Sequence, residues 1–294
     1  MNKAQEITSQ LWEMANRLRS NMDASEYRNY ILGFMFYRYL SEHQEKSMVE
    51  NKLIDVAEGQ SVNDAYKEQA SGEDLNDYLE EIASSLGYAI APEYTWATIV
   101  DKVNNNTIAP SDYQDMLDSF NHNLNLNRNA KMDFHGIFDD MNLGNSRLGN
   151  STSARAKALT DIVNLVDQIE YKDENGHDIL GDIYTYLIAE FAGNSGKKAG
   201  EFYTPHQVSE ILAKLVTLNL DPGIKNPEVY DFACGSGSLL LTVQDQVPNR
   251  RLKYAGQELN TTTYNLARMN LMMHDVRYQN MTLKNADTLE MDWP

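Results

Sequence analysis

Three acidic side chains recur at nearly constant spacing in the second half of the sequence. Asp231, Glu258 and Asp287 are 27 and 29 residues apart, about the length of one strand–helix repeat. Each carboxylate comes at the end of a short run that is typical of a buried strand. Because ligands of open α/β sheets bind outside the carboxyl ends of the strands, the spacing predicts three carboxylates at one binding site.

A glycine-containing turn accompanies the first of these carboxylates. Residues 231–240 read Asp-Phe-Ala-Cys-Gly-Ser-Gly-Ser-Leu-Leu, between a predicted strand and a predicted helix. Gly235 and Gly237 allow a sharp bend and the close approach of a ligand. Backbone N–H groups at the start of the helix could hold a polar or anionic group. The turn and the carboxylates together favour a nucleotide-like ligand.

The chemistry of the carboxylates narrows the choice of ligand. Asp231 can face an ammonium group, Glu258 can accept both hydroxyls of a ribose, and Asp287 can accept from the amino group of a base. This set fits S-adenosylmethionine, which has an amino acid tail, a cationic centre, a ribose and an adenine. A dinucleotide fits less well, because Asp231 would repel its pyrophosphate and Leu240 replaces the third glycine of Gly-x-Gly-x-x-Gly.

The elements that must position these residues follow from hydrophobic periodicity and turn signals. The order of patterns predicts two consecutive βαβ units, hence a parallel sheet with right-handed crossovers. Before the sheet, Thr204 and Pro205 are expected to cap and open a helix. The expected strands are 228–232, 252–258 and 281–286, and the expected helices are 154–169, 179–192, 207–218, 238–246 and 261–274.

The first half of the sequence predicts an α-helical domain. Residues 27–40 are apolar around most of the helical circumference, which predicts a central, buried helix whose aromatic side chains pack in a core. A stretch rich in Asn, Gly, Ser and Thr from Asn142 to Ser153 marks the expected boundary. We therefore expect an α-helical domain at 1–150 and an α/β, Rossmann-like domain at 151–294.

Composition limits the possible functions. The 294 residues carry a formal charge of −18, so any action on DNA would need a partner that brings cationic surface. No apolar run approaches the roughly 20 residues of a membrane span, and the N-terminus lacks the pattern of a signal peptide. The single cysteine, Cys234, is interpreted as a packed residue. The six histidines show no metal-ligand spacing, and we expect a cytoplasmic protein without a metal site.

Longer motifs resemble one known family. The chain is similar to the modification (methyltransferase) subunit of type I restriction-modification systems, an N6-adenine DNA methyltransferase, over essentially all of its length. The segments that carry the resemblance are 22–33 (Met-Asp-Ala-Ser-Glu-Tyr-Arg-Asn-Tyr-Ile-Leu-Gly), 134–140 (Phe-His-Gly-Ile-Phe-Asp-Asp), 147–150 (Arg-Leu-Gly-Asn), 178–184 (Asp-Ile-Leu-Gly-Asp-Ile-Tyr) and 200–205 (Gly-Glu-Phe-Tyr-Thr-Pro).

The resemblance implies a class I methyltransferase domain with S-adenosylmethionine as its cofactor. It implies that Glu258 holds the ribose and Asp287 the adenine. It also implies partners: a DNA-specificity subunit, a second modification subunit and a translocating restriction subunit, with double-stranded DNA bound through the complex. The implied contacts to the methionine end are Glu201, Phe202, Tyr203, Thr204, Pro205, His206, Asp231, Ala233, Gly235, Ser236, Gly237 and Ser238.

One motif of the family is absent. The Asn-Pro-Pro-(Phe/Tyr) element, which holds the flipped target adenine, does not occur in the 294 residues. We therefore expect a fragment with about three strands, no catalytic residues of its own and no methyl transfer. The strand at 228–232 is expected to be an open edge beside uncovered apolar surface.

Two other functions stay open on the sequence alone. If residue 294 is a natural end, the chain could be a non-catalytic module that binds a nucleotide and a partner. An NAD-dependent enzyme is the third hypothesis, although Asp231 and Leu240 disfavour it.

Overall fold

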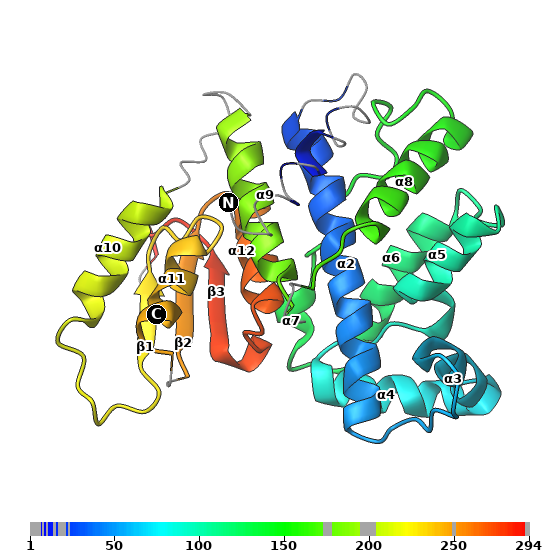
Figure 1. Cartoon of the computed structure of the whole chain (residues 1–294), viewed down its shortest axis with the longest axis horizontal. Helices are drawn as coiled ribbons and strands as arrows, with labels where there is room; N and C mark the ends of the chain where they lie inside the picture. The colour runs from blue at the N-terminus through cyan, green and yellow to red at the C-terminus, as the bar shows by residue number, and fades with distance from the viewer. Residues whose placement is uncertain are drawn as a thin grey trace. The chain divides into compact units, whose positions relative to one another are not determined.

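The helices and strands fall into two compact units. A computed structural model of the chain (Figure 1) describes residues 24–172, 178–194, 204–248 and 251–291, with Ile7, Ser9, Leu11, Trp12, Glu13, Asn16 and Met22. The contacts between residues divide the chain into two units. The helical unit contains residues 29–169 and the sheet unit residues 170–291, and a few N-terminal residues belong to each.

Over its described residues, the helical unit consists of helices alone, as the prediction of an α-helical domain requires. The helix α8 belongs with this unit, so the contact division falls after Ile169, one helix beyond the boundary expected at residue 150. Its elements are α2 (Ala24–Glu50), α3 (Val62–Gln69), η1 (Gly72–Asp74), α4 (Leu75–Leu86), η2 (Pro92–Tyr94), α5 (Trp96–Asn104), α6 (Asp112–Asn123), η3 (Leu124–Leu126), α7 (Lys131–Phe134) and α8 (Thr152–Asp167).

The long helix α2 carries the aromatic core of this unit. Phe34, Phe36 and Tyr37 are fully buried, as the apolar circumference of 27–40 predicts. The ring of Phe34 lies 6.4 Å from that of Trp96 and 6.1 Å from that of Tyr113, distances typical of packed aromatic pairs. The predicted central, buried helix is therefore confirmed.

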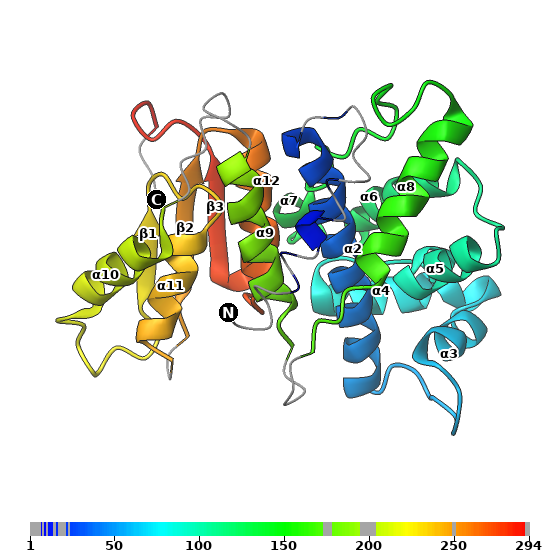
Figure 2. The ribbon, with the colours of Figure 1, turned by 45° about the horizontal axis from the view of Figure 1, so that its top comes forward.

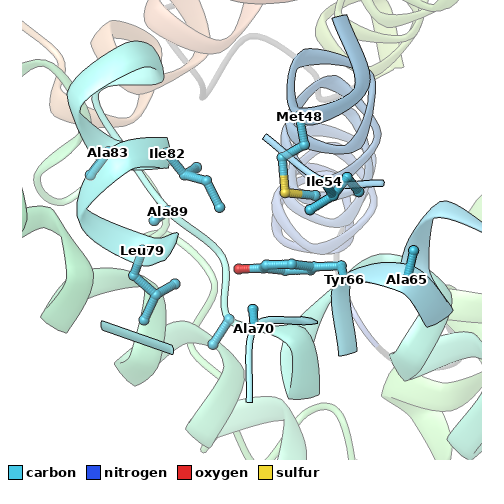
Figure 3. Packing of buried hydrophobic residues seen from close by; sticks show 10 residues of the cluster. Met48, Ile54, Ala65, Tyr66, Ala70, Leu79, Ile82, Ala83 and Ala89 are labelled. Carbon is cyan, nitrogen blue, oxygen red and sulfur yellow. The ribbon is translucent and has the colours of Figure 1, made fainter. Parts of the chain in front are cut away.

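A second cluster of buried residues forms where α2 meets α3 and α4. Figure 3 shows the ring of Tyr66 with Met48 and Ile54 on one side and Ala70 on the other. The Tyr66 hydroxyl donates to the carbonyl of Ile90 at 2.9 Å. Burial without this partner would leave a polar group unsatisfied, so the hydrogen bond fixes the segment before η2 against the cluster.

Arg38 holds the end of α8. Its guanidinium is buried and Nη1 donates to the carbonyls of Val166 at 2.7 Å and of Asp167 and Ile169 at 3.3 Å. The last carbonyls of a helix lack partners within the helix, and a buried cation is well suited to bind them. Trp96 Nε1 adds a hydrogen bond of 2.9 Å to the Asp167 carboxylate.

The sheet unit contains the two predicted βαβ repeats. The three strands pair in the order β1-β2-β3, all parallel, and Asp231 is paired with Gly256, and Glu258 with Asn285. The prediction of a parallel sheet is confirmed. Its elements are α9 (Leu180–Asn194), α10 (His206–Thr217), β1 (Glu228–Asp231), α11 (Ser238–Gln246), β2 (Lys253–Glu258), α12 (Thr261–Met273), η4 (Tyr278–Asn280) and β3 (Met281–Asn285).

One face of this sheet is covered and the other is largely open. Two right-handed crossovers that advance in one direction place α11 and α12 on the same face, where Tyr254 is buried. On the opposite face Glu228, Lys253 and Thr282 are exposed, and Tyr230 is 39% exposed. Parallel sheets are normally covered on both faces. Within the described residues β1 pairs with β2 alone, which confirms the expected open edge.

Helix α10 packs along α11, beside the covered face (Figures 1 and 2). It begins at His206 with Pro205 in the extended N-cap position and no side-chain cap. The expected capping role of Thr204 is therefore wrong, since Thr204 lies one residue outside the cap. The outward face of α10 carries apolar side chains that are each at least 40% exposed, namely Val208, Ile211, Leu212, Leu215 and Val216.

Candidate functional site

The predicted site is built on the turn between β1 and α11. Gly235 and Gly237 have φ angles of +56° and +79°, a region that glycine adopts without the strain of a Cβ. Gly237 occupies the N-cap position of α11, which has no side-chain cap. The first N–H groups of α11 therefore keep their capacity to bind a polar ligand group.

Asp231 ends β1 at this turn. Its Oδ1 accepts the N–H of Ala233 at 3.0 Å. Burial raises the pKa of the Asp231 carboxyl, and the Ala233 hydrogen bond opposes that shift. A half-buried carboxylate without full solvation gains most from a cationic ligand group, which is the role that the sequence predicts.

Glu258, at the end of β2, is fastened to the glycine turn. Its Oε2 accepts the N–H of Gly235 at 3.1 Å, and its Oε1 accepts the N–H of Asn260 at 2.8 Å. Each carboxylate oxygen has a further lone pair, so both can still accept from ligand hydroxyls. The sequence predicts the position of Glu258 beside the turn, but it does not predict these two backbone hydrogen bonds.

Asp287 follows β3 in a turn of its own. Its Oδ1 accepts the N–H of Leu289 at 2.9 Å. The neighbouring Thr288 hydroxyl donates to the carbonyl of Phe232, in the turn after β1. The loops after β1 and β3 are thereby in direct contact, and they bring Asp287 to the end of the sheet where Asp231 lies.

The remaining predicted contacts divide into two groups. Residues 201–203, the predicted Glu-Phe-Tyr, lie outside the described residues. Thr204, Pro205 and His206 precede or open α10, and the His206 ring lies 3.3 Å from the Glu210 carboxylate. The last turn of α10 leads through residues 218–227 to the start of β1, so the first turn of α10 lies at the same end of the sheet as the glycine turn (Figure 1).

Ser236 and Ser238 complete the turn. Their hydroxyls lie 3.1 Å apart, and the Ser236 carbonyl accepts the side-chain amide of Asn270 at 2.9 Å. Asn270 is fully buried in α12, so α12 holds the turn in place through this hydrogen bond.

Cys234 has a structural role in this turn. It is buried, and burial together with the nearby Asp231 and Glu258 charges raises the pKa of its thiol to about 12. A thiol with so high a pKa is a poor nucleophile at neutral pH. Within the described residues no group of three or more His, Cys, Asp or Glu side chains could hold a metal ion, and no helix there is long and apolar enough to span a membrane.

Two family models match the chain. Residues 7–166 match the HsdM N-terminal domain, and residues 175–294 match N-6 DNA Methylase. The first model covers more than half of the sequence, and the second contains every residue of the site described above.

Individual relatives agree with these models. The type I restriction enzyme MpnII methylase subunit of Mycoplasma pneumoniae is 33% identical over 96% of this chain and 52% of its own length. The MjaIX methylase subunit of Methanocaldococcus jannaschii is 25% identical over 94% of this chain and 49% of its length. This chain thus spans about half the length of these relatives.

A solved structure shows the same fold. The type I restriction-modification system methyltransferase subunit from Streptococcus thermophilus superposes with a TM-score of 0.84 and 32% sequence identity. The match covers all of this chain and 60% of that one. The two units of the present chain therefore occur together in a protein of greater length.

Proposed function

The chain belongs to the family of type I restriction-modification methylase subunits, and from this premise we propose that its sheet unit binds S-adenosylmethionine for methyl transfer to N6 of adenine in DNA. The relatives named above are all methylase or methyltransferase subunits. They support this function over a non-catalytic nucleotide-binding module and over an NAD-dependent enzyme.

The observation that carries the proposal is the hydrogen bond between Glu258 and Gly235. It fixes an acidic side chain beside an uncapped helix N-terminus, so one small region offers both acceptors and donors. Ribose hydroxyls would donate to Glu258, and the carboxylate of the amino acid tail would accept from the first N–H groups of α11. The acidic surroundings would repel a pyrophosphate.

The other side chains fit the remaining parts of the cofactor. Asp231 would face the ammonium group and Asp287 the exocyclic amino group of the adenine. Phe232 follows Asp231 and Leu259 follows Glu258. Their side chains are 64% and 66% exposed, so they offer apolar surface against which a purine ring can pack. Residues 201–206 would contact the methionine end, as in the motif that they match.

Bound S-adenosylmethionine supplies an electrophilic methyl group on a sulfonium. The protein's task is to hold that group in line with the adenine amino nitrogen, because positioning is a large part of such catalysis. The family's Asn-Pro-Pro-aromatic motif, which orients the flipped adenine, is absent from residues 1–294. We therefore propose that this polypeptide binds the cofactor and transfers no methyl group by itself.

Partners follow from the same proposal. A formal charge of −18 makes broad contact with DNA unfavourable. A DNA-specificity subunit would choose the site, a second methylase subunit would complete the methylase, and restriction subunits would add translocation and cleavage.

Calorimetry tests the cofactor assignment directly. The chain is titrated with S-adenosylmethionine, S-adenosylhomocysteine and NAD under one set of conditions. Binding of the first two and none of NAD is the expected result. Binding of NAD alone would overturn the proposal, and methyl transfer to DNA by residues 1–294 alone would overturn the claim of inactivity.

A further inference from the structure

Asn285 uses both polar atoms of its side chain on the last residue of β2 and the segment that follows it. Nδ2 donates to the carbonyls of Glu258 at 2.8 Å and Leu259 at 2.9 Å. Oδ1 accepts the hydroxyl of Thr261 at 2.9 Å. An asparagine amide has two donor hydrogens, so both are satisfied within one four-residue segment. Asn285 also ends β3, two residues before Asp287, and is paired with Glu258 in the sheet.

The hydrogen bonds of Asn285 act on the backbone of Glu258, whose side chain is held as well. The Glu258 carboxylate accepts from Gly235 and Asn260, while Asn285 binds the Glu258 carbonyl. Glu258 is thus fixed at its backbone and at its carboxylate before any ligand arrives. Such preorganisation removes the entropic cost of ordering the side chain during binding.

The three loops at this end of the sheet form a closed set of contacts. Glu258 joins the loop after β2 to Gly235 in the loop after β1. Asn285 joins the end of β3 to the loop after β2. Thr288 joins the loop after β3 back to Phe232. Of these three side-chain contacts, those of Asn285 act directly on the backbone that carries the Glu258 carboxylate, where the N–H of Ala286 also binds the Glu258 carbonyl at 3.2 Å.

We propose that Asn285 is a positioning residue that sets the Glu258 carboxylate for recognition of ribose hydroxyls. The inference rests on the proposed binding of S-adenosylmethionine. A purely stabilising role makes a different prediction. Asn285 is exposed, and if its bonds only stabilised the loop, their loss would weaken the binding of every ligand by the same factor. A positioning role predicts a loss that depends on the ribose hydroxyl itself.

The test compares two ligands and two proteins in a double-mutant cycle. The ligands are S-adenosylhomocysteine and its 2′-deoxy analogue, and the proteins are the unsubstituted chain and Asn285→Ala. In the unsubstituted chain, removal of the hydroxyl is expected to weaken binding about tenfold. In Asn285→Ala the same removal is expected to weaken binding less than about threefold.

Further variants separate positioning from folding. Asn285→Asp keeps the acceptor for Thr261 but loses the donors, and it is expected to behave like Asn285→Ala. Thr261→Val frees the Asn285 amide to rotate and is expected to reduce the hydroxyl dependence in part. The matched control is Asn125→Ala, an exposed asparagine of the helical unit whose Nδ2 binds the His122 carbonyl at 2.8 Å. It is expected to leave both affinities unchanged.

The outcomes are distinguishable. If Asn285→Ala weakens both ligands equally and keeps the tenfold hydroxyl dependence, the positioning role is overturned while the proposed function stands. If the unsubstituted chain binds S-adenosylhomocysteine with no hydroxyl dependence, Glu258 is not the ribose contact and the inference falls. If the unsubstituted chain does not bind S-adenosylhomocysteine at all, the proposed function falls and the inference with it.

Discussion

Cys234 packs directly on Gly256, the residue of β2 that is paired with Asp231. A Cβ added at position 256 would lie 3.0 Å from the Cys234 sulfur and 2.9 Å from Cδ2 of Leu283. Both neighbours belong to the packed layer between the strands and their helices. The close approach lets the glycine turn fold down onto β2, which brings Gly235 within reach of Glu258.

Gly256→Ala is therefore expected to destabilise the sheet unit by about 1–3 kcal/mol through overpacking. Urea unfolding followed by circular dichroism measures the change. The double variant Gly256→Ala with Cys234→Ala is expected to recover part of the loss, because the sulfur is removed. Equal stability of Gly256→Ala and the unsubstituted chain would show that the contact relaxes without cost.

The thiol of Cys234 is expected to resist modification in the folded chain. Burial and two nearby carboxylates raise its pKa to about 12, and the thiolate is the reactive form. Labelling with a disulfide reagent at pH 8 is expected to be slow in native buffer and fast in denaturing urea. Equal rates in the two conditions would contradict the packed environment described for this residue.

Substitution of Glu258 separates its two roles. Glu258→Gln keeps an oxygen that can accept from Gly235 or Asn260 but lacks the charge and one acceptor. It is expected to weaken S-adenosylhomocysteine about 10-fold, whereas Glu258→Ala, which also frees the turn, is expected to cost about 100-fold. Calorimetry measures both. Unchanged affinity in both variants would exclude Glu258 from the cofactor site.

Much of the sheet unit could be predicted because its signals are local. The helix expected at 238–246 has those bounds in the structure, and the strand expected at 252–258 runs over Lys253–Glu258. The placement of Asp231, Glu258 and Asp287 at one end of the sheet also follows from their spacing, which is about one strand–helix repeat. Regular alternation of strand and helix leaves few other arrangements.

The hydrogen bonds that organise the site could not be predicted in the same way. The bond from Gly235 to Glu258 depends on how far β2 extends past β1, and the bonds of Asn285 depend on the register of β3. Register is a tertiary property that no single segment encodes. The N-cap of α10 was wrong by one residue for a related reason, since the extended backbone of Pro205 decides where the helix begins.

Arg38→Ala is expected to destabilise the helical unit by about 2–4 kcal/mol. The substitution removes the charged donor that the carbonyls of Val166, Asp167 and Ile169 share at the end of α8. A suitable probe is Trp96 fluorescence during urea unfolding, in a chain where the other tryptophans are replaced by phenylalanine. Lys46→Ala is the control, because Lys46 forms an exposed pair with Glu50, and its loss should change stability by less than about 0.5 kcal/mol. Equal effects of the two substitutions would contradict the role given to Arg38.

Glu45 is expected to make the helical unit more stable in mild acid. Burial, reinforced by the nearby Glu42 carboxylate, raises the pKa of Glu45 from 4.5 to about 7. A folded-state pKa above the unfolded one contributes stability that is lost as the pH rises from about 4.5 to 7. Glu45→Gln is expected to remove this loss and to raise stability at pH 8 by up to about 3 kcal/mol.

Urea unfolding at pH 5 and pH 8, again with Trp96 as the probe, measures this effect. The control is Glu50→Gln, since Glu50 lies on the same helix with an exposed side chain, and it should leave the pH dependence unchanged. A pH dependence in Glu45→Gln equal to that of the unsubstituted chain would exclude Glu45 as its source.

The strand order β1-β2-β3 has a consequence for synthesis. Strands that pair in their order along the chain can be added one after another as the polypeptide leaves the ribosome, each on the strand made just before it. Every pairing then closes a loop of only one helix, which keeps the entropic cost of each step small. In the part of the chain that the structure describes, growth on the β3 side leaves the outer edge of β1 unpaired and the apolar face of α10 exposed. These two surfaces are therefore the parts of the sheet unit most exposed to wrong association during folding.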